Sequence, residues 1–282
     1  MTGVHDAFAL VQELADELSK GEIQLPSLPR AVVRLRNELA KPGFDVPRLA
    51  TLASTEPALA ASILTMANSV TFRRAGKETL DLKIAIPRIG AGKVQALAVR
   101  FAMQQLKLHA ELGRSRKLLE REWALGLRVA ATCYLVAEKS RAVKPDEALI
   151  VGLIHNIGRI YLYSRADRHP AIFDTPVALQ ELVESWHSNV ARAIVESWEL
   201  PAEAAEAVGR QDEDEDGAPC GDMTYVLRGA LLVQGIEGEP ADETVSEMAQ
   251  RRAFRALRLG PAEILAIHES REPTRLTLGL TD

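Results

Sequence analysis

The chain has 282 residues, 47% of them hydrophobic, so it can bury a sizeable core in one large domain or two smaller ones. It has only two cysteines, Cys133 and Cys220, and no Cys-x-x-Cys spacing, which excludes a disulfide-rich scaffold and a thiolate metal cage and favours a reducing cytoplasm. The net charge is −5 and no apolar run reaches the roughly 18 residues that span a bilayer, so we expect a cytoplasmic protein that binds neither membranes nor nucleic acid.

Apolar residues recur at steps of three and four along most of the chain, which predicts an all-α protein. We expect Ser54 or Thr55 to cap a helix that begins at Pro57 and continues to about residue 70. A second amphipathic helix is predicted from residue 94 to a stop near Gly113, and a third over residues 123–137.

The second half of the chain begins with its most apolar segment. Pro145 starts it, and residues 148–163 are predicted to form one central helix. Further helices are expected after Pro176 and Pro201 and across residues 242–258, and a last helix is expected to begin at Pro261.

Composition shifts suggest three parts. We predict an N-terminal helical subdomain over residues 1–112, a second helical subdomain over residues 113–236, and a C-terminal helical extension over residues 237–282. The acidic run at residues 212–216 carries a charge equal to the whole net charge, and it is expected to form a solvated loop.

His155 and Asn156 are polar residues inside the most apolar predicted helix. Burying an imidazole and a carboxamide costs free energy unless both are hydrogen-bonded, so the pair needs an explanation. The two residues could be metal ligands, or they could be core residues that bond to neighbouring backbone. Asparagine is a poor replacement for the anionic ligand that a divalent cation prefers, which favours the core interpretation.

Several ordered motifs resemble one known family. TEPALAASILTMANS (55–69), AIPRIGAGKVQALAV (85–99) and EALIVGLIHNIGRIYLY (147–163) are similar to motifs of HDOD proteins, the HD-related output domains of bacterial signalling. LPSLPRAVVRL (25–35) and WHSNVARAIVESWELP (186–201) match further family motifs. The resemblance implies an all-α HDOD fold, in which a multi-helix N-terminal subdomain packs on an HD-like C-terminal subdomain.

The resemblance also relates the chain to HD-domain metal phosphohydrolases, whose metal ligands it largely lacks. The early histidine position falls at Leu125, the His-Asp pair is His155-Asn156, and the late aspartate position falls near Ala230. His187 stands where a later histidine is expected, while Arg210 and Gln211 replace adjacent histidines. A catalytic divalent site needs about three protein ligands, so we predict no metal, no cofactor and no catalytic residue.

Two other features have both structural and functional explanations. Asn68-Ser69 matches the family's Ala-Asn-Ser signature, and its side chains could cap a helix or contact a ligand or partner. Cys133 lies in a predicted helix and is expected to be a core residue instead of a nucleophile.

The sequence therefore predicts a non-catalytic signalling protein that acts by binding other signalling proteins and that could also form a homo-oligomer. The alternative is a regulatory module that binds a nucleotide or cyclic dinucleotide in the former active-site cleft, through His155, Asn156, His187 and Arg210. A third hypothesis is a metal-dependent phosphohydrolase, which is disfavoured because most of the metal ligands of such enzymes are missing.

Overall fold

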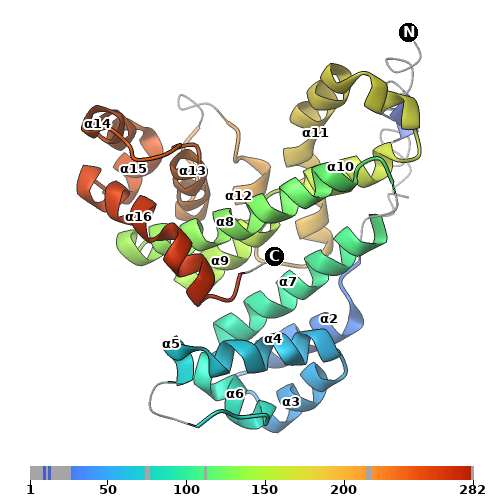
Figure 1. The fold of residues 1–282 in the computed structure, drawn as a ribbon, viewed down its shortest axis with the longest axis vertical. Coiled ribbons are helices and arrows are strands. Elements are labelled where there is room, and N and C mark those ends of the chain that lie inside the picture. Colours follow the sequence, from blue (N-terminus) through green and yellow to red (C-terminus); the bar gives the residue numbers. More distant parts are fainter. Residues whose placement is uncertain are drawn as a thin grey trace.

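The structure, a computed structural model, describes residues 9–10, 12–13, 27–73, 77–110, 113–213 and 218–280. Every regular element in these ranges is a helix, which confirms the all-α prediction. The N-terminal helices are α2 (Arg30–Leu39), α3 (Val46–Ser54), α4 (Pro57–Asn68), α5 (Val70–Arg73), α6 (Leu82–Ile89) and α7 (Ala91–Ala110). Helices α2 to α6 gather in the lower lobe of the molecule (Figure 1).

The second lobe is built around long central helices. Its elements are α8 (Arg116–Ser140), α9 (Pro145–Ile154), α10 (Ile157–Ala166), the 3-10 helix η1 (Pro170–Asp174), α11 (Pro176–Ser197), α12 (Ala202–Gly209), α13 (Asp222–Gln234), α14 (Asp242–Gln250), α15 (Arg252–Leu257) and α16 (Pro261–Thr277). Helices α13 to α16 form one side of this lobe, and α10 and α11 form the other (Figure 1). Among the described residues, no helix combines the length and apolar composition needed to cross a bilayer.

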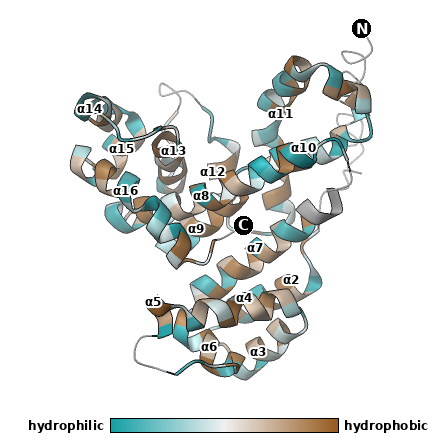
Figure 2. Ribbon diagram, in the orientation of Figure 1, coloured by the Kyte–Doolittle hydropathy of each residue, from teal (hydrophilic) through white to brown (hydrophobic). Residues whose placement is uncertain are grey.

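Helix α7 belongs to both lobes. Its residues Val94, Leu97 and Phe101 are buried in the N-terminal core, whereas Val99 and Met103 are buried in the larger C-terminal core. Hydrophobic and hydrophilic residues alternate along this helix, as Figure 2 shows. Each lobe therefore covers a different apolar face of the same helix.

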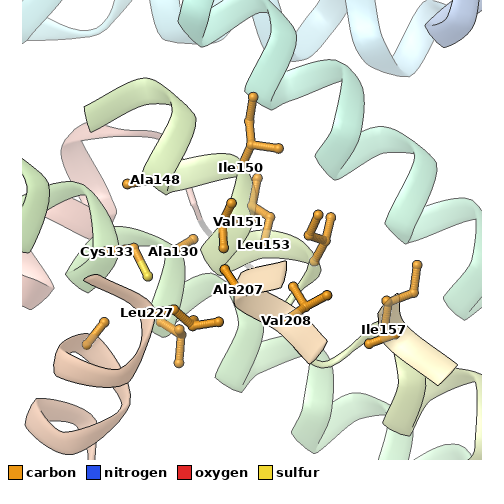
Figure 3. Close-up of a cluster of buried hydrophobic side chains, with 14 of the residues drawn as sticks. Ala130, Cys133, Ala148, Ile150, Val151, Leu153, Ile157, Ala207, Val208 and Leu227 are labelled. Atoms are coloured by element: carbon orange, nitrogen blue, oxygen red, sulfur yellow. The ribbon is translucent and has the colours of Figure 1, made fainter. Parts of the chain in front are cut away.

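The C-terminal core depends on the close approach of α8 and α9. Helix α8 contributes small residues such as Ala130 and Cys133, α9 contributes Ile150 and Val151, and Figure 3 shows these side chains meeting residues of α12 and α13. Gly152 allows the closest contact, because an ideal Cβ atom there would lie 2.5 Å from the Cα atom of Ala130. Burial of α9 leaves Leu149 and Ile154 at most 1% exposed, and each such side chain stabilises the fold by about 2 kcal/mol.

Three local predictions were wrong. The central helix is interrupted at residues 155–156, so α9 and α10 are separate, and the predicted helix over 242–258 is likewise two helices. Ser54 and Thr55 do not cap α4. Their hydroxyl groups donate instead to the carbonyl oxygens of Thr51 (2.8 Å) and Leu52 (2.7 Å), so they terminate α3. Pro57 nevertheless begins α4, and Pro261 begins α16, as predicted.

Candidate functional site

The candidate site lies at the break between α9 and α10. Asn156 has φ −102° and ψ 15°, a conformation outside the helical range, and α10 starts at the next residue. His155 and Asn156 are 3% and 2% exposed, so the break is buried. It turns the two side chains toward different neighbours.

His155 is held as a neutral imidazole. Its Nδ1 atom lies 2.7 Å from the carbonyl oxygen of Gly152, and burial lowers the pKa of the ring to about 4. The Gln211 side chain donates to the carbonyl oxygen of His155 at 2.9 Å and to that of Val208 at 2.8 Å. Gln211 thereby satisfies backbone acceptors at the ends of both α9 and α12.

Asn156 binds Glu122, a buried glutamate of α8 for which no sequence motif predicted a role. Its Nδ2 atom donates to the carbonyl oxygen of Glu122 at 2.6 Å and to Oε2 of the same residue at 3.1 Å. Burial raises the pKa of Glu122, although the hydrogen bond from Asn156 and the nearby Arg159 oppose this effect. The Oδ1 atom of Asn156 is buried without a hydrogen-bond partner in the described part of the chain.

Arg159 is the main cation of the site. It lies one turn after His155 on α10, and its guanidinium binds both carboxylate oxygens of Glu184, at 2.8 and 2.7 Å. The same Nη2 atom lies 2.9 Å from Nε2 of His187, which is 1% exposed on α11. The hydrogen bond from Arg159 holds the pKa of Glu184 below its ordinary value.

Asp212 completes the cluster and places a carboxylate beside the imidazole of His187, although the sequence motifs predicted no acidic ligand there. Its Oδ2 atom lies 3.1 Å from Nε2 of His187 and also accepts from the hydroxyl group of Ser188. Burial raises the pKa of Asp212, but the hydrogen bonds from His187 and Ser188 together bring it below its ordinary value. The first residue of the acidic run is thus part of the site; residues 214–216 lie outside the described residues.

Arg210 does not join this cluster. Its guanidinium binds Glu206 at 3.0 Å and Glu213 at 2.8 Å, and it also donates to the carbonyl oxygens of Ala218 and Pro219. These contacts tie the C-terminal end of α12 to the segment before α13. The cation near the imidazoles is Arg159, which the sequence did not single out.

Asn68 and Ser69 lie in the other lobe, at the end of α4. The Asn68 amide donates to the carbonyl oxygen of Thr79 and accepts from its N–H group, both at 2.9 Å. It therefore fixes the segment that leads into α6. The Ser69 hydroxyl is buried and has no hydrogen-bond partner among the described residues. Cys133 is fully buried, and burial raises the pKa of its thiol, as expected of a core cysteine.

The residues of the site do not fit a divalent metal ion. His155 still presents an imidazole whose Nδ1 is fixed by backbone, as in metal-binding histidines. However, Nε2 of His187 and the Glu184 carboxylate face the guanidinium of Arg159, which a divalent cation would have to displace. Within the described ranges, no three His, Cys, Asp or Glu side chains are placed to hold one metal ion.

Comparison with known proteins gives a family match and a shared fold. A sequence model of the HDOD domain matches residues 25–213. A Treponema pallidum protein of uncharacterised function is 24% identical over 68% of this chain, which spans only 37% of that protein's length.

Two solved structures share the architecture along most of the chain. One, from Shewanella amazonensis, is described as a "putative metal-dependent phosphohydrolase"; it is 23% identical, the match covers 98% of this chain and 100% of that one, and the TM-score is 0.76. The other is an HDOD domain protein of unknown function from Geobacter sulfurreducens, 20% identical over 94% of this chain and 96% of its own, with a TM-score of 0.70. At these identities the likenesses show a common fold.

Proposed function

The chain belongs to the HDOD family, and from this premise we propose that it is a non-catalytic regulatory protein that transmits a signalling state by binding another protein. The observation that carries the proposal is the pairing of Arg159 with His187 and Glu184. The guanidinium of Arg159 occupies the space beside His187 and Glu184 that a metal ion would need in order to use these two residues as ligands. With Asn156 turned to Glu122, the site retains a hydrogen-bonded polar network and lacks a metal-binding set.

A hydrolysis assay tests the non-catalytic part. The purified protein, supplied in turn with Mn²⁺, Mg²⁺, Fe²⁺ and Zn²⁺, is incubated with nucleotides and cyclic dinucleotides, and products are separated by chromatography. We expect no turnover above the protein-free blank. Metal-dependent hydrolysis that is abolished in His155→Ala and retained in the control His169→Ala would overturn the proposal.

A pull-down tests the interaction part. Tagged wild-type protein is used as bait in lysate of the native organism, and captured proteins are re-examined with purified components by calorimetry. We expect a signalling protein or a second copy of the chain to bind stoichiometrically. A protein that binds no such partner, yet hydrolyses a substrate, would sink the proposal.

The polar cluster around Arg159 supports a second candidate function, nucleotide binding without hydrolysis. Arg159 is 19% exposed and is the one cation that the described site presents to a phosphate, which would compete with Glu184. Thermal-shift measurements against nucleotides test this. A ligand at 100 times its dissociation constant stabilises a protein by about 2.7 kcal/mol. Stabilisation by a nucleotide that is lost in Arg159→Ala would support the second function. If no nucleotide stabilises the protein, the protein-binding function stands alone.

A further inference from the structure

A separate cavity of about 370 Å³ lies where α9 and α12 begin, whereas His155 and Gln211 lie just after the ends of these two helices. Its volume is within the range of small-molecule sites. Part of its wall is apolar and buried, and this part is formed by α9, α12, α13 and the segment before α12. The wall residues are Ile150, Val151, Leu200, Ala204 and Met223.

One polar side chain in this wall lacks a partner. Thr224 of α13 lines the cavity and is 1% exposed, and its Oγ1 atom has no hydrogen-bond partner among the described residues. A buried hydroxyl group without a hydrogen-bond partner lowers the stability of the folded protein. A bound molecule with a polar group could provide that partner.

Four carboxylates line the same cavity. Glu147 pairs with Lys144 at 2.8 Å and Glu206 with Arg210 at 3.0 Å, whereas no described residue forms an ion pair with Glu203 or Asp222. Both unpaired residues lie in the first turn of a helix, where the helix dipole favours a negative charge. The helix dipoles explain why each carboxylate is stable at its own helix start, but they do not explain why both line the same cavity. Their convergence on one apolar cavity adds a negative rim to it.

We propose that this cavity binds a small molecule that joins an apolar body to a protonated amine. The apolar body would be buried against Ile150, Ala204 and Met223. The ammonium group would lie at the rim near Glu203 and Asp222, and a polar group of the ligand would bond to Thr224. The chain's formal charge of −5 also favours a cationic ligand over an anionic one.

The cavity is linked to the His155 site through two packed helices. Helices α9 and α12 pack together, with their first turns at the cavity, and Gln211, which follows α12, donates to the carbonyl oxygen of His155, which follows α9. A ligand that shifts α12 against α9 would strain this hydrogen bond. The use of the cavity as a signal input rests on the regulatory function proposed above; the binding site itself does not.

Matched probes test the site. Octylammonium, octanol and octanoate share one apolar chain and differ in their head groups, and their affinities for the full-length protein are measured by calorimetry. We expect octylammonium to bind about tenfold more tightly than octanoate, with octanol between them. Equal affinities for the three probes, or tighter binding of octanoate, would overturn the proposal.

Variants place the probe in the cavity. Ala204→Phe fills it and should weaken octylammonium binding at least about tenfold, whereas Ala202→Phe, at an exposed position of the same helix, should leave it unchanged. The double variant Glu203→Gln/Asp222→Asn should lose the preference for octylammonium over octanol, and Glu181→Gln on α11 is its exposed control. Unchanged binding in both Ala204→Phe and the double variant would overturn the proposal.

A third variant, Thr224→Val, tests the site with little disturbance of the fold, because valine has nearly the same shape as threonine. Thr224→Val should therefore fold with equal or higher stability, since it removes the unpartnered hydroxyl. It should weaken the binding of a probe with a second polar group, such as 8-aminooctan-1-ol, and leave octylammonium binding unchanged. Detection of metal-dependent hydrolysis would overturn the proposed function and leave this site untouched. Failure of octylammonium to bind would overturn the site and leave the proposed function standing.

Discussion

Nη2 of Arg159 lies 2.9 Å from Nε2 of His187, and Oδ2 of Asp212 lies 3.1 Å from the same ring nitrogen. One nitrogen atom cannot accept a hydrogen bond from Arg159 and donate one to Asp212 at the same time. In either tautomer, however, Nε2 is engaged within the protein. The guanidinium of Arg159 is a positive charge that acts on both Glu184 and Asp212.

Replacing Arg159 should lower the stability of the protein, because three carboxylates lose a neighbouring positive charge. Arg159→Ala leaves Glu184, Asp212 and the buried Glu122 without their shared cation, so we expect a loss of about 2–3 kcal/mol in the free energy of unfolding. The same variant should gain thermal stability from millimolar Mn²⁺, whereas the wild type should not. Chemical denaturation and thermal shift measure the two effects.

Arg192→Ala is the matched control for that change. Arg192 pairs with Glu196 on the exposed face of α11 at 2.9 Å, and both side chains are 54% exposed. Its loss should cost about 0.3–0.5 kcal/mol and produce no response to Mn²⁺. If wild type and Arg159→Ala respond equally to Mn²⁺, Arg159 does not block a cation site.

His155 should make the protein acid-sensitive. Burial lowers its folded-state pKa to about 4, while the unfolded chain takes up the proton near 6.5, so stability is lost as the pH falls from 6.5 toward 4. Between pH 7.5 and pH 5 this loss amounts to about 2 kcal/mol. His155→Gln should remove that part of the pH dependence in urea denaturation.

Glu122 contributes with the opposite sign, because its raised pKa stabilises the folded state as the pH falls. It is present in both proteins, so the comparison of wild type with His155→Gln isolates the imidazole. An identical loss of stability in the two proteins would show that His155 is not the buried neutral base described above.

Gly158 should tolerate no side chain. An ideal Cβ atom at this position would lie 2.0 Å from the carbonyl oxygen of His187, which is backbone and cannot move aside cheaply. Gly158→Ala should therefore lower the free energy of unfolding by about 3 kcal/mol or more and separate α10 from α11. Gly126→Ala is the control, because its nearest neighbour would be 3.4 Å away. It should change stability by less than about 1 kcal/mol.

Asn68 and Ser69 should behave differently although they are neighbours. Asn68→Ala removes two hydrogen bonds to Thr79 and should cost about 1–3 kcal/mol. Ser69→Ala removes a buried hydroxyl group without a partner and should be neutral or slightly stabilising. Equal losses in thermal denaturation would contradict the structural role assigned to Asn68.

Local pattern predicted the helices well, because apolar spacing and proline starts act within one element. It missed the break at His155 and Asn156, since residues 148–163 are apolar on every side and contain no glycine or proline at that point. The break is stabilised by Glu122 and Gln211, which lie 34 and 56 residues away from their partners. No window of the sequence contains those contacts.

Among the site residues, too, some could be predicted from local sequence pattern and others depend on distant contacts. His155, Asn156 and His187 could be selected because buried polar residues are unusual and because family motifs mark them. Asp212 carries no such local signal, because it belongs to an acidic run. Arg159 is a charged residue in the apolar segment 148–163, but no local pattern shows that it contacts His187 and Glu184. Their roles come from the packing of α10 against α11 and from the turn after α12. The placement of Arg210 away from the cleft is likewise a consequence of tertiary structure.

Helix α7 gives the molecule an unusual kind of boundary. Because Leu97 and Phe101 face one core while Val99 and Met103 face the other, the border between the lobes runs along the helix axis instead of across the chain. A fragment that ends at residue 112 would keep α7 but expose the face that packs on the C-terminal core. A fragment that begins at residue 91 would keep α7 but expose the face that packs on the N-terminal core. Neither half can be detached as a stable module, so the two lobes are expected to unfold in one cooperative transition.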